Sequence, residues 1–305
     1  MIPATVDPGD MPAIAVRAEE QGFDLLACGE HVFFGSPSPN AFVALAAAAA
    51  VTTRLRLLSA VTLLPLYPAP LAAKMATTVD RVSKGRFELG VGVGGENPVE
   101  FEACGVPVRE RGRRGDAALD AVVRLFTGES IEVPGADGGV ERATLDPLPV
   151  QRPRPPVWVG GRSEASMRRA GRAGDVWMPY LCSPDRVARG LATAREEAER
   201  HGRDPADVTG AYLAWGAVDP DPALARSTAL AGLAAVYGQD MDRIADACIP
   251  HGTPEQVTAR LREYRDAGAE QVVFAPAVSD AGRDAMVELF ATDVLPALRS
   301  AEVDA

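Results

Sequence analysis

Residues 83–97, SKGRFELGVGVGGEN, place a short apolar run directly before a series of glycines. Phe87–Val93 reads as a buried β-strand because it is apolar, partly β-branched and bounded by polar residues and glycines. The glycines at its end allow backbone amides to approach a flat or phosphorylated ligand closely. On both sides of this stretch, similar short apolar runs alternate with longer amphipathic segments.

The alternation predicts eight strands and eight helices in 305 residues. Ser163 and Thr253 stand where helix N-caps belong, and Gly22 and Gly268 where helices end. This count is that of a (β/α)8 barrel, although a doubly wound open sheet accommodates it too. The predicted strands are Ile2–Val6, Phe23–Cys28, Leu55–Thr62, Phe87–Val93, Pro156–Val159, Val176–Pro179, Thr209–Val218 and Gln271–Ala275. The predicted helices lie near 10–21, 40–51, 69–83, 112–127, 163–173, 184–201, 253–268 and 282–299.

Two stretches do not fit the repeat. Residues 129–155 are rich in Gly and Pro and read as an insertion carrying a small hairpin. Residues 219–250 read as an extra helical excursion before the last strand–helix unit. Because no linker separates two halves, we expect residues 1–305 to form a single domain with these two insertions.

The charge balance excludes several partner classes. Acidic residues number 42 against 31 basic ones, a net charge of −11. Nucleic-acid binding and docking on an anionic membrane both need a basic surface, so neither is expected. The apolar run 41–51 is too short to cross a bilayer, and the N-terminus carries no export signal. Four scattered cysteines without CxxC spacing indicate free thiols, and we expect a cytoplasmic protein.

Polar residues follow several predicted strands, where a barrel would place its active site. Glu30 and His31 end the second strand, and a histidine there can move a proton near neutral pH, with Glu30 orienting it. The alternative is that His31 is a loop residue whose hydrogen bonds are satisfied within the protein and that takes no part in catalysis. His201 and His251 lie far away in the sequence, so no metal site is expected.

Gly160-Gly161-Arg162-Ser163 follows the predicted strand 156–159 and leads into a helix. Unpaired amides and the positive end of the helix dipole favour an anion there, and Arg162 adds a charged donor. An ordinary strand-to-helix turn capped by Ser163 is the alternative. The run Arg109–Arg114 likewise reads as a solvated helix start, or as a grip on an anionic cofactor tail.

The motif Gly90-Val91-Gly92-Val93-Gly94-Gly95 matches GxGxxG, but a dinucleotide fold is not predicted from it. That fingerprint opens a helix directly and is followed about 20 residues later by an acidic residue at a strand end. Here Pro98 follows almost at once, and an arginine-rich helix start occupies the later position.

Five stretches, taken in order, resemble the bacterial luciferase-like oxidoreductases over roughly residues 10–280. They are Ala18–Asp24, Gly29–His31, Ser83–Gly92, Gln151–Gly161 and Ala173–Trp177. The resemblance implies a TIM barrel that binds FMN or the deazaflavin coenzyme F420. The first strand is unusually short for this family, so either the barrel tolerates it or the natural start lies upstream. The segment Glu96-Asn97-Pro98-Val99, after the glycines, is about one residue longer than is common in this family, which leaves the placement of Glu96 open.

The resemblance also implies residue roles. His31 would lie near the reactive ring carbon and move a proton, with Glu30 and Glu96 as weaker polar candidates. A cis peptide at Ala60–Val61 would back the central ring. The predicted cofactor-binding residues are Ala60, Val61, Gly92, Val93, Gly94, Gly160, Gly161, Arg162 and Ser163.

Several functions remain open at this point. The first is an F420-dependent oxidoreductase that transfers hydride to or from a small organic substrate. The second is an FMN-dependent monooxygenase supplied with reduced flavin by a separate reductase. A non-catalytic flavin-binding protein and a non-redox barrel enzyme using His31 and Glu30 are further alternatives. A homodimer is expected, and apolar residues such as Phe33, Phe34, Leu181 and Tyr237 favour an uncharged or amphipathic substrate.

Overall fold

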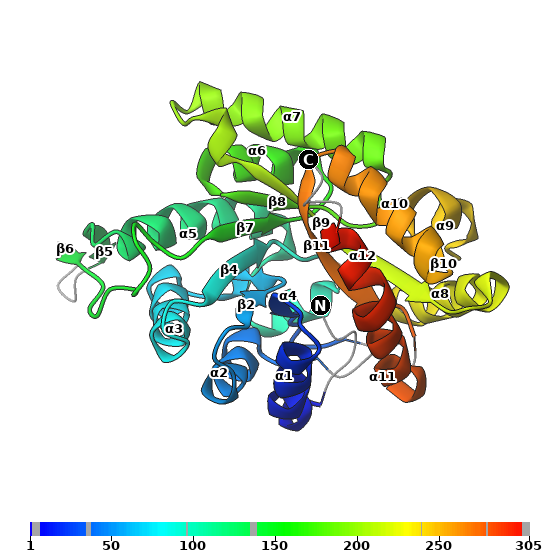
Figure 1. Cartoon of the computed structure of the whole chain (residues 1–305). Helices are drawn as coiled ribbons and strands as arrows, with labels where there is room; N and C mark the ends of the chain where they lie inside the picture. The colour runs from blue at the N-terminus through cyan, green and yellow to red at the C-terminus, as the bar shows by residue number, and fades with distance from the viewer. Residues whose placement is uncertain are drawn as a thin grey trace.

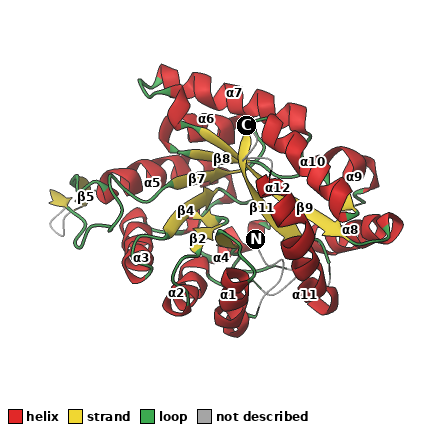
Figure 2. Ribbon diagram, viewed as in Figure 1, coloured by secondary structure: helices red, strands yellow, loops and turns green. Residues whose placement is uncertain are grey.

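A ring of helices surrounds one curved parallel sheet in the computed structural model of the chain (Figures 1 and 2). The structure describes Met1 and residues 7–34, 38–95, 97–134, 139–238, 240–278 and 280–300. The parallel strands are β1 (Leu25–Cys28), β2 (Arg56–Ser59), β3 (Thr62–Leu63), β4 (Phe87–Gly92), β7 (Val157–Gly160), β8 (Val176–Met178), β9 (Thr209–Val218), β10 (His251–Gly252) and β11 (Ala269–Pro276).

The helices follow the strands in the order expected of a barrel. They are α1 (Met11–Glu20), α2 (Ala41–Val51), α3 (Ala69–Val82), α4 (Pro98–Ala103), α5 (Arg111–Phe126), α6 (Glu164–Ala173), α7 (Pro184–Arg200), α8 (Pro222–Tyr237), α9 (Asp242–Cys248), α10 (Pro254–Asp266), α11 (Asp280–Leu289) and α12 (Leu295–Ser300). A π-helical turn, Phe290–Val294, joins the last two, so the predicted helix 282–299 is interrupted. No described helix is long and apolar enough to cross a membrane.

The sheet runs β1-β2-β4-β7-β8-β9-β10, with β11 also paired to β9 and β3 to β4. This forms a nearly closed barrel, so the predicted barrel is confirmed and the open-sheet alternative is wrong. The predicted strand Ile2–Val6 lies outside the described residues. The Ala27 amide in β1 donates to the Met1 carbonyl at 2.8 Å.

The two irregular stretches carry structure of their own. Residues Ile131–Pro134 (β5) and Val140–Ala143 (β6) form an antiparallel hairpin that projects from the barrel (Figure 1). Helices α8 and α9 occupy the second stretch, between β9 and β10.

The predicted strand Leu55–Thr62 is not continuous. It divides into β2 and β3 at a cis peptide bond between Ala60 and Val61, the bond that the family resemblance implies. Pairing with β4 shifts by one residue across this point, from Leu58 opposite Glu88 to Thr62 opposite Val91. The strand therefore turns locally.

Polar side chains fasten the amino ends of the strands. Arg86, just before β4, donates to main-chain carbonyls at the end of α2 and the start of β2. Gln151, before β7, donates to Asp80 at 2.8 Å, and Arg154 holds Asp175 with two hydrogen bonds of 2.5 and 2.8 Å. Arg86, Gln151, Arg154 and Asp175 belong to the motifs that resemble the family. Those parts of the motifs therefore stabilise the amino ends of the strands.

Glu19 fastens α1 to the segment that enters β2. Its carboxylate accepts the amides of Thr53, Arg54 and Leu55, the last two at 2.6 and 2.8 Å. Desolvation alone would raise the pKa of Glu19, but the three amides and the Arg54 charge outweigh it and lower the pKa to about 2.

We expect Glu19→Gln to destabilise the protein in a pH-dependent way. A carboxylate whose folded pKa lies below its unfolded value stabilises the fold above pH of about 4.5, and this is lost as the pH falls toward 2. For this partly exposed site the free energy of unfolding should fall by about 1 kcal/mol at pH 7. Urea unfolding of the wild type, Glu19→Gln and the exposed neighbour variant Glu20→Gln measures it. A Glu19→Gln deficit that is equal at pH 7 and pH 3.5, or matched by Glu20→Gln, contradicts the assignment.

Candidate active site

A cavity of about 620 Å³ opens at the carboxyl ends of the strands. All eleven residues predicted as catalytic or cofactor-binding line it: Glu30, His31, Ala60, Val61, Gly92, Val93, Gly94, Gly160, Gly161, Arg162 and Ser163. Whether each contacts a cofactor stays a prediction. Glu96 lies outside the described residues.

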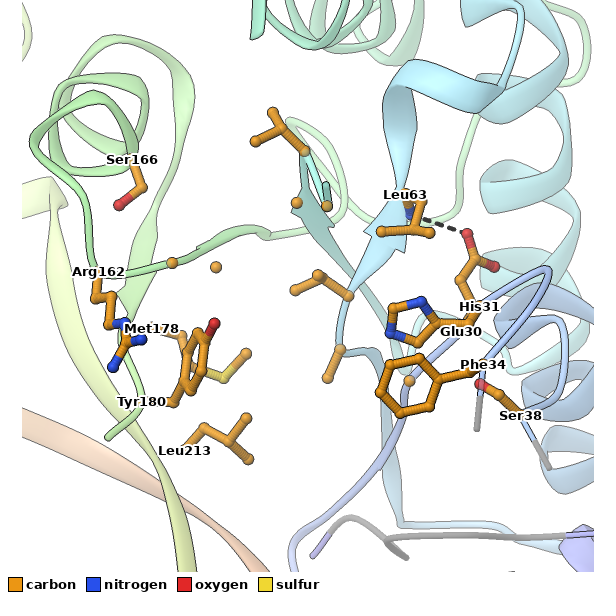
Figure 3. A pocket seen from close by; sticks show the side chains of 18 of the residues that line it. Glu30, His31, Phe34, Ser38, Leu63, Arg162, Ser166, Met178, Tyr180 and Leu213 are labelled. Atoms are coloured by element: carbon orange, nitrogen blue, oxygen red, sulfur yellow. Dashed lines mark hydrogen bonds between the residues drawn. The ribbon is translucent and has the colours of Figure 1, made fainter. Parts of the chain in front are cut away.

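His31 faces the cavity from the loop after β1 (Figure 3). Its Nδ1 lies 3.2 Å from both carboxylate oxygens of Glu100, which is fully buried in α4. The Val32 amide also donates to Glu100, at 3.1 Å. The prediction that Glu30 orients His31 is therefore wrong, because Glu100 does so.

Glu30 instead connects three elements. It accepts hydrogen bonds from the Leu63 amide in β3 at 2.8 Å, the Ala41 amide at the start of α2 at 3.2 Å, and the Asn40 and Tyr67 side chains. Burial raises the pKa of Glu30, although its donors act in the opposite direction. These contacts favour a positioning role over the catalytic role predicted for it.

Val61 forms the middle of one cavity wall. Its side chain occupies the space that Gly92 and Gly160 leave open: a Cβ atom on Gly92 would lie 2.4 Å from Val61 Cγ2, and one on Gly160 would lie 2.7 Å from Val61 Cγ1. Real Cβ atoms do not approach so closely, so both positions require glycine while Val61 keeps this orientation.

The loop after β7 differs from the prediction in one respect. The Gly161 amide donates to the Met178 carbonyl at 3.2 Å, so it does not face an anion. Ser163 caps α6 by accepting the Ser166 amide. The first amides of this helix, at Glu164 and Ala165, precede the intrahelical hydrogen bonds and are the donors that an anion would meet.

Arginines gather at the same rim of the cavity. In the described part of the chain, four of them line it, Arg109, Arg111, Arg162 and Arg169, against one carboxylate, Glu30. Arg169 is paired with Asp116 at 2.8 Å. Among the described residues, the other three have no carboxylate partner. Arg111 donates to the Gly94 and Val108 carbonyls, and Arg162 lies 5.3 Å from the centre of the Tyr180 ring.

Sequence reasoning missed Glu100 and Arg169. Glu100 is an acidic residue in the first turn of a six-residue helix, and one sequence carries no signal that pairs it with His31, 69 residues earlier. Arg169 sits within a helix rich in arginine and looks like its neighbours. In the part of the chain that the structure describes, no group of His, Cys, Asp or Glu could hold a metal ion.

Known proteins resemble this arrangement. Residues 1–271 match the family described as luciferase-like monooxygenase. Uncharacterized proteins of Mycobacterium bovis and Mycobacterium tuberculosis are 37% identical over 169 residues, which are 55% of this chain and 57% of theirs. The match thus spans little more than half the length of these curated relatives.

Solved structures share the fold along nearly the whole chain. The monooxygenase RslO1 from Streptomyces bottropensis has a TM-score of 0.79 and 26% identity, covering 95% of this chain and 93% of its own. An F420-dependent secondary alcohol dehydrogenase in complex with an F420-acetone adduct gives 0.82 and 22%, covering 98% and 99%. An FMN complex of the oxygenating constituent of 3,6-diketocamphane monooxygenase from Pseudomonas putida gives 0.74 and 19%, covering 95% and 92%.

We expect Gly92→Ala to destabilise the protein by about 1–3 kcal/mol, because its Cβ would overlap Val61. Adding Val61→Ala should recover most of this loss, since the overlapping methyl groups are then gone. A double-mutant cycle from chemical unfolding measures the coupling, for which we expect about 1–2 kcal/mol.

Gly112→Ala is the matched control for this cycle, because nothing lies within 4 Å of the added Cβ and alanine suits a helix. Additive effects of Gly92→Ala and Val61→Ala would show that Val61 does not occupy this space.

Proposed function

The chain belongs to the luciferase-like monooxygenase family, and on that premise we propose that it is an oxidoreductase that binds coenzyme F420 in the cavity at the carboxyl ends of its strands. Its substrate is a small organic molecule that exchanges hydride with the deazaflavin. Two observations support the enzymatic part of this proposal. Residues from the ends of several strands line one cavity, and the His31 side chain in that cavity is paired with Glu100.

The arginines that have no described carboxylate partner are the reason for proposing F420 rather than FMN. Arg109, Arg111 and Arg162 line the cavity of a chain whose net charge is −11, and no described carboxylate neutralises them. Such a cluster attracts anions and raises their local concentration. FMN ends at its phosphate, whereas F420 continues beyond its phosphate with several carboxylates. The excess of cations around the start of α5 and α6 favours the cofactor with the longer anionic tail.

The cavity walls fit a flat ring system. A volume of about 620 Å³ lies within the range of ligand sites, and Val61, held between Gly92 and Gly160, gives the ring a smooth apolar support. The arginine rim then lies at the phosphate end. When bound, the cofactor supplies a carbon that accepts or donates hydride.

His31 accepts or donates the proton that is transferred together with the hydride. Because Nδ1 faces the Glu100 carboxylate, it carries the proton that this carboxylate accepts, and Nε2 is left for the substrate. If an alcohol gave its carbinol hydride to a bound deazaflavin, Nε2 of His31 would accept the hydroxyl proton and a carbonyl compound would result. Glu100 is buried and held by two donors, so it fixes the ring and stabilises the charge that His31 gains.

Monooxygenation with reduced FMN is the second candidate. The likeness to the monooxygenase RslO1 favours it. In that case His31 would serve the oxygen chemistry, and a separate reductase would supply the reduced flavin.

We expect F420 to bind more tightly than FMN in parallel equilibrium titrations, and its affinity to fall as salt is added. Arg109→Gln should weaken F420 binding about 5- to 10-fold, the value of one charge-assisted contact of about 1 to 1.4 kcal/mol. It should leave unchanged the weaker binding of the deazaflavin riboside that lacks phosphate and tail.

Arg113→Gln is the control for Arg109→Gln, since Arg113 lies on the same run but is exposed and paired with Glu110. Tighter binding of FMN would replace the proposal with the second candidate. Equal effects of the two substitutions would remove Arg109 from the site.

We expect His31→Gln to lower turnover about 10²- to 10⁴-fold while the dissociation constant of the cofactor changes less than about threefold, as for the loss of a general acid–base group. Glu100→Gln should have a smaller effect of the same kind. The assay follows reduction of F420 by a panel of secondary alcohols, with oxygen uptake recorded separately. Turnover that is unchanged in His31→Gln would show that the proton takes another route.

A further inference from the structure

Two aromatic groups face each other across the cavity. On one side, Phe34 stacks on His31 with ring centroids 4.1 Å apart and planes inclined by 13°. On the other, Tyr180 and Tyr237 stack at 6.4 Å and 12°, and Trp215 meets the Tyr237 ring edge-on at 6.3 Å. Figure 3 shows His31 and Phe34 opposite Tyr180, with open space between them.

These residues come from four separate segments of the chain. Phe34 follows β1, Tyr180 follows β8, Trp215 lies in β9 and Tyr237 ends α8. Helix α8 belongs to the stretch 219–250 that does not fit the strand–helix repeat, so this excursion supplies one wall of the cavity. Its α8 packs against β9 and β10.

Much of the remaining lining between the two groups is apolar, although Ser38 lies beside Phe34 (Figure 3). Met178, Leu213 and Val236 also line this space, and Figure 3 places the first two beside Tyr180. Glu30, the one lining carboxylate among the described residues, is held by four protein donors. The Arg162 guanidinium lies over the Tyr180 ring, 5.3 Å from its centre, in a cation–π contact. Among the described residues, no charged side chain lies on the Phe34 side of the slot apart from the His31–Glu100 pair and the bonded Glu30, whereas a flat apolar substrate would find ring faces on both sides.

We propose that this aromatic slot binds a substrate with a flat aromatic ring system whose carbonyl or hydroxyl group points at His31. The inference rests on the proposed function, because His31 is taken as the proton-transfer group of that reaction. It names the class of substrate that the cavity selects.

Ring stacking adds to the area that a ligand buries. An aromatic pair contributes enough to shift an equilibrium constant about 2- to 12-fold beyond its apolar area. Two ketones with the same carbon skeleton isolate this contribution: 1-tetralone, which contains a benzene ring, and 1-decalone, which is fully saturated. Isothermal titration calorimetry gives both dissociation constants, for the protein as purified and for the protein loaded with F420 or FMN.

We expect 1-tetralone to bind about 5- to 10-fold more tightly than 1-decalone. Phe34→Leu and Tyr237→Leu should each reduce this preference to about twofold or less, and Tyr237→Phe should keep it because the ring remains. Phe33→Leu is the matched control, since Phe33 is the exposed neighbour of Phe34 on the same loop, 48% accessible to solvent.

Equal binding of the two ketones, binding of neither, or a preference that Phe34→Leu and Tyr237→Leu leave intact overturns the proposal. Circular dichroism of each variant shows whether it is folded, and Tyr237→Phe serves as the conservative substitution if Tyr237→Leu is not. The ketone pair tests the aromatic slot, whereas the F420 and FMN titrations test the cofactor proposal. The failure of one proposal is therefore distinguishable from the failure of the other.

Discussion

The shape of the cavity depends on the contact between Val61 and the backbone of Gly92 and Gly160. The pairing register shifts by one residue where β2 becomes β3, and this places Val61 across the ends of the neighbouring strands. A side chain at either glycine would collide with it at 2.4–2.7 Å. Three strands thus share one apolar surface, and because protein interiors are close-packed, this surface transmits any change in one strand to the other two.

The two ends of the barrel satisfy their charges differently. At the amino ends of the strands, Arg86, Asp80 and Asp175 are held by carbonyls, amides or opposite charges within the protein. At the carboxyl ends, Arg109 and Arg162 line the cavity without a described carboxylate partner. Polar groups that the fold itself satisfies contribute to stability, whereas charges that no opposite charge neutralises beside a cavity are available to a ligand. This contrast locates the functional end of the molecule independently of any resemblance.

The periodicity of the sequence predicts the fold because each strand–helix unit is a local pattern. It also places residues such as His31 and Gly160 at strand ends, which a parallel barrel brings to one face. It does not reveal the His31–Glu100 contact, since nothing local distinguishes Glu100 from other acidic residues at a helix start. Nor does it show that the Gly161 amide is used by Met178, because a strand-to-helix turn looks the same whether its amides are free or bonded. Contacts between distant segments are the part that only the three-dimensional structure reveals.

The cavity has two regions that favour different kinds of ligand. Its arginine rim, formed around the starts of α5 and α6, attracts negative charge, while the slot between Phe34 and Tyr237 offers mainly ring faces, with the Arg162 guanidinium over the Tyr180 ring. A single small ligand cannot satisfy both, because an anion gains little between apolar rings and a flat apolar molecule gains little among arginines. A cofactor with an anionic tail and a flat ring, placed beside a second flat molecule that reaches His31, uses every part of the cavity at once.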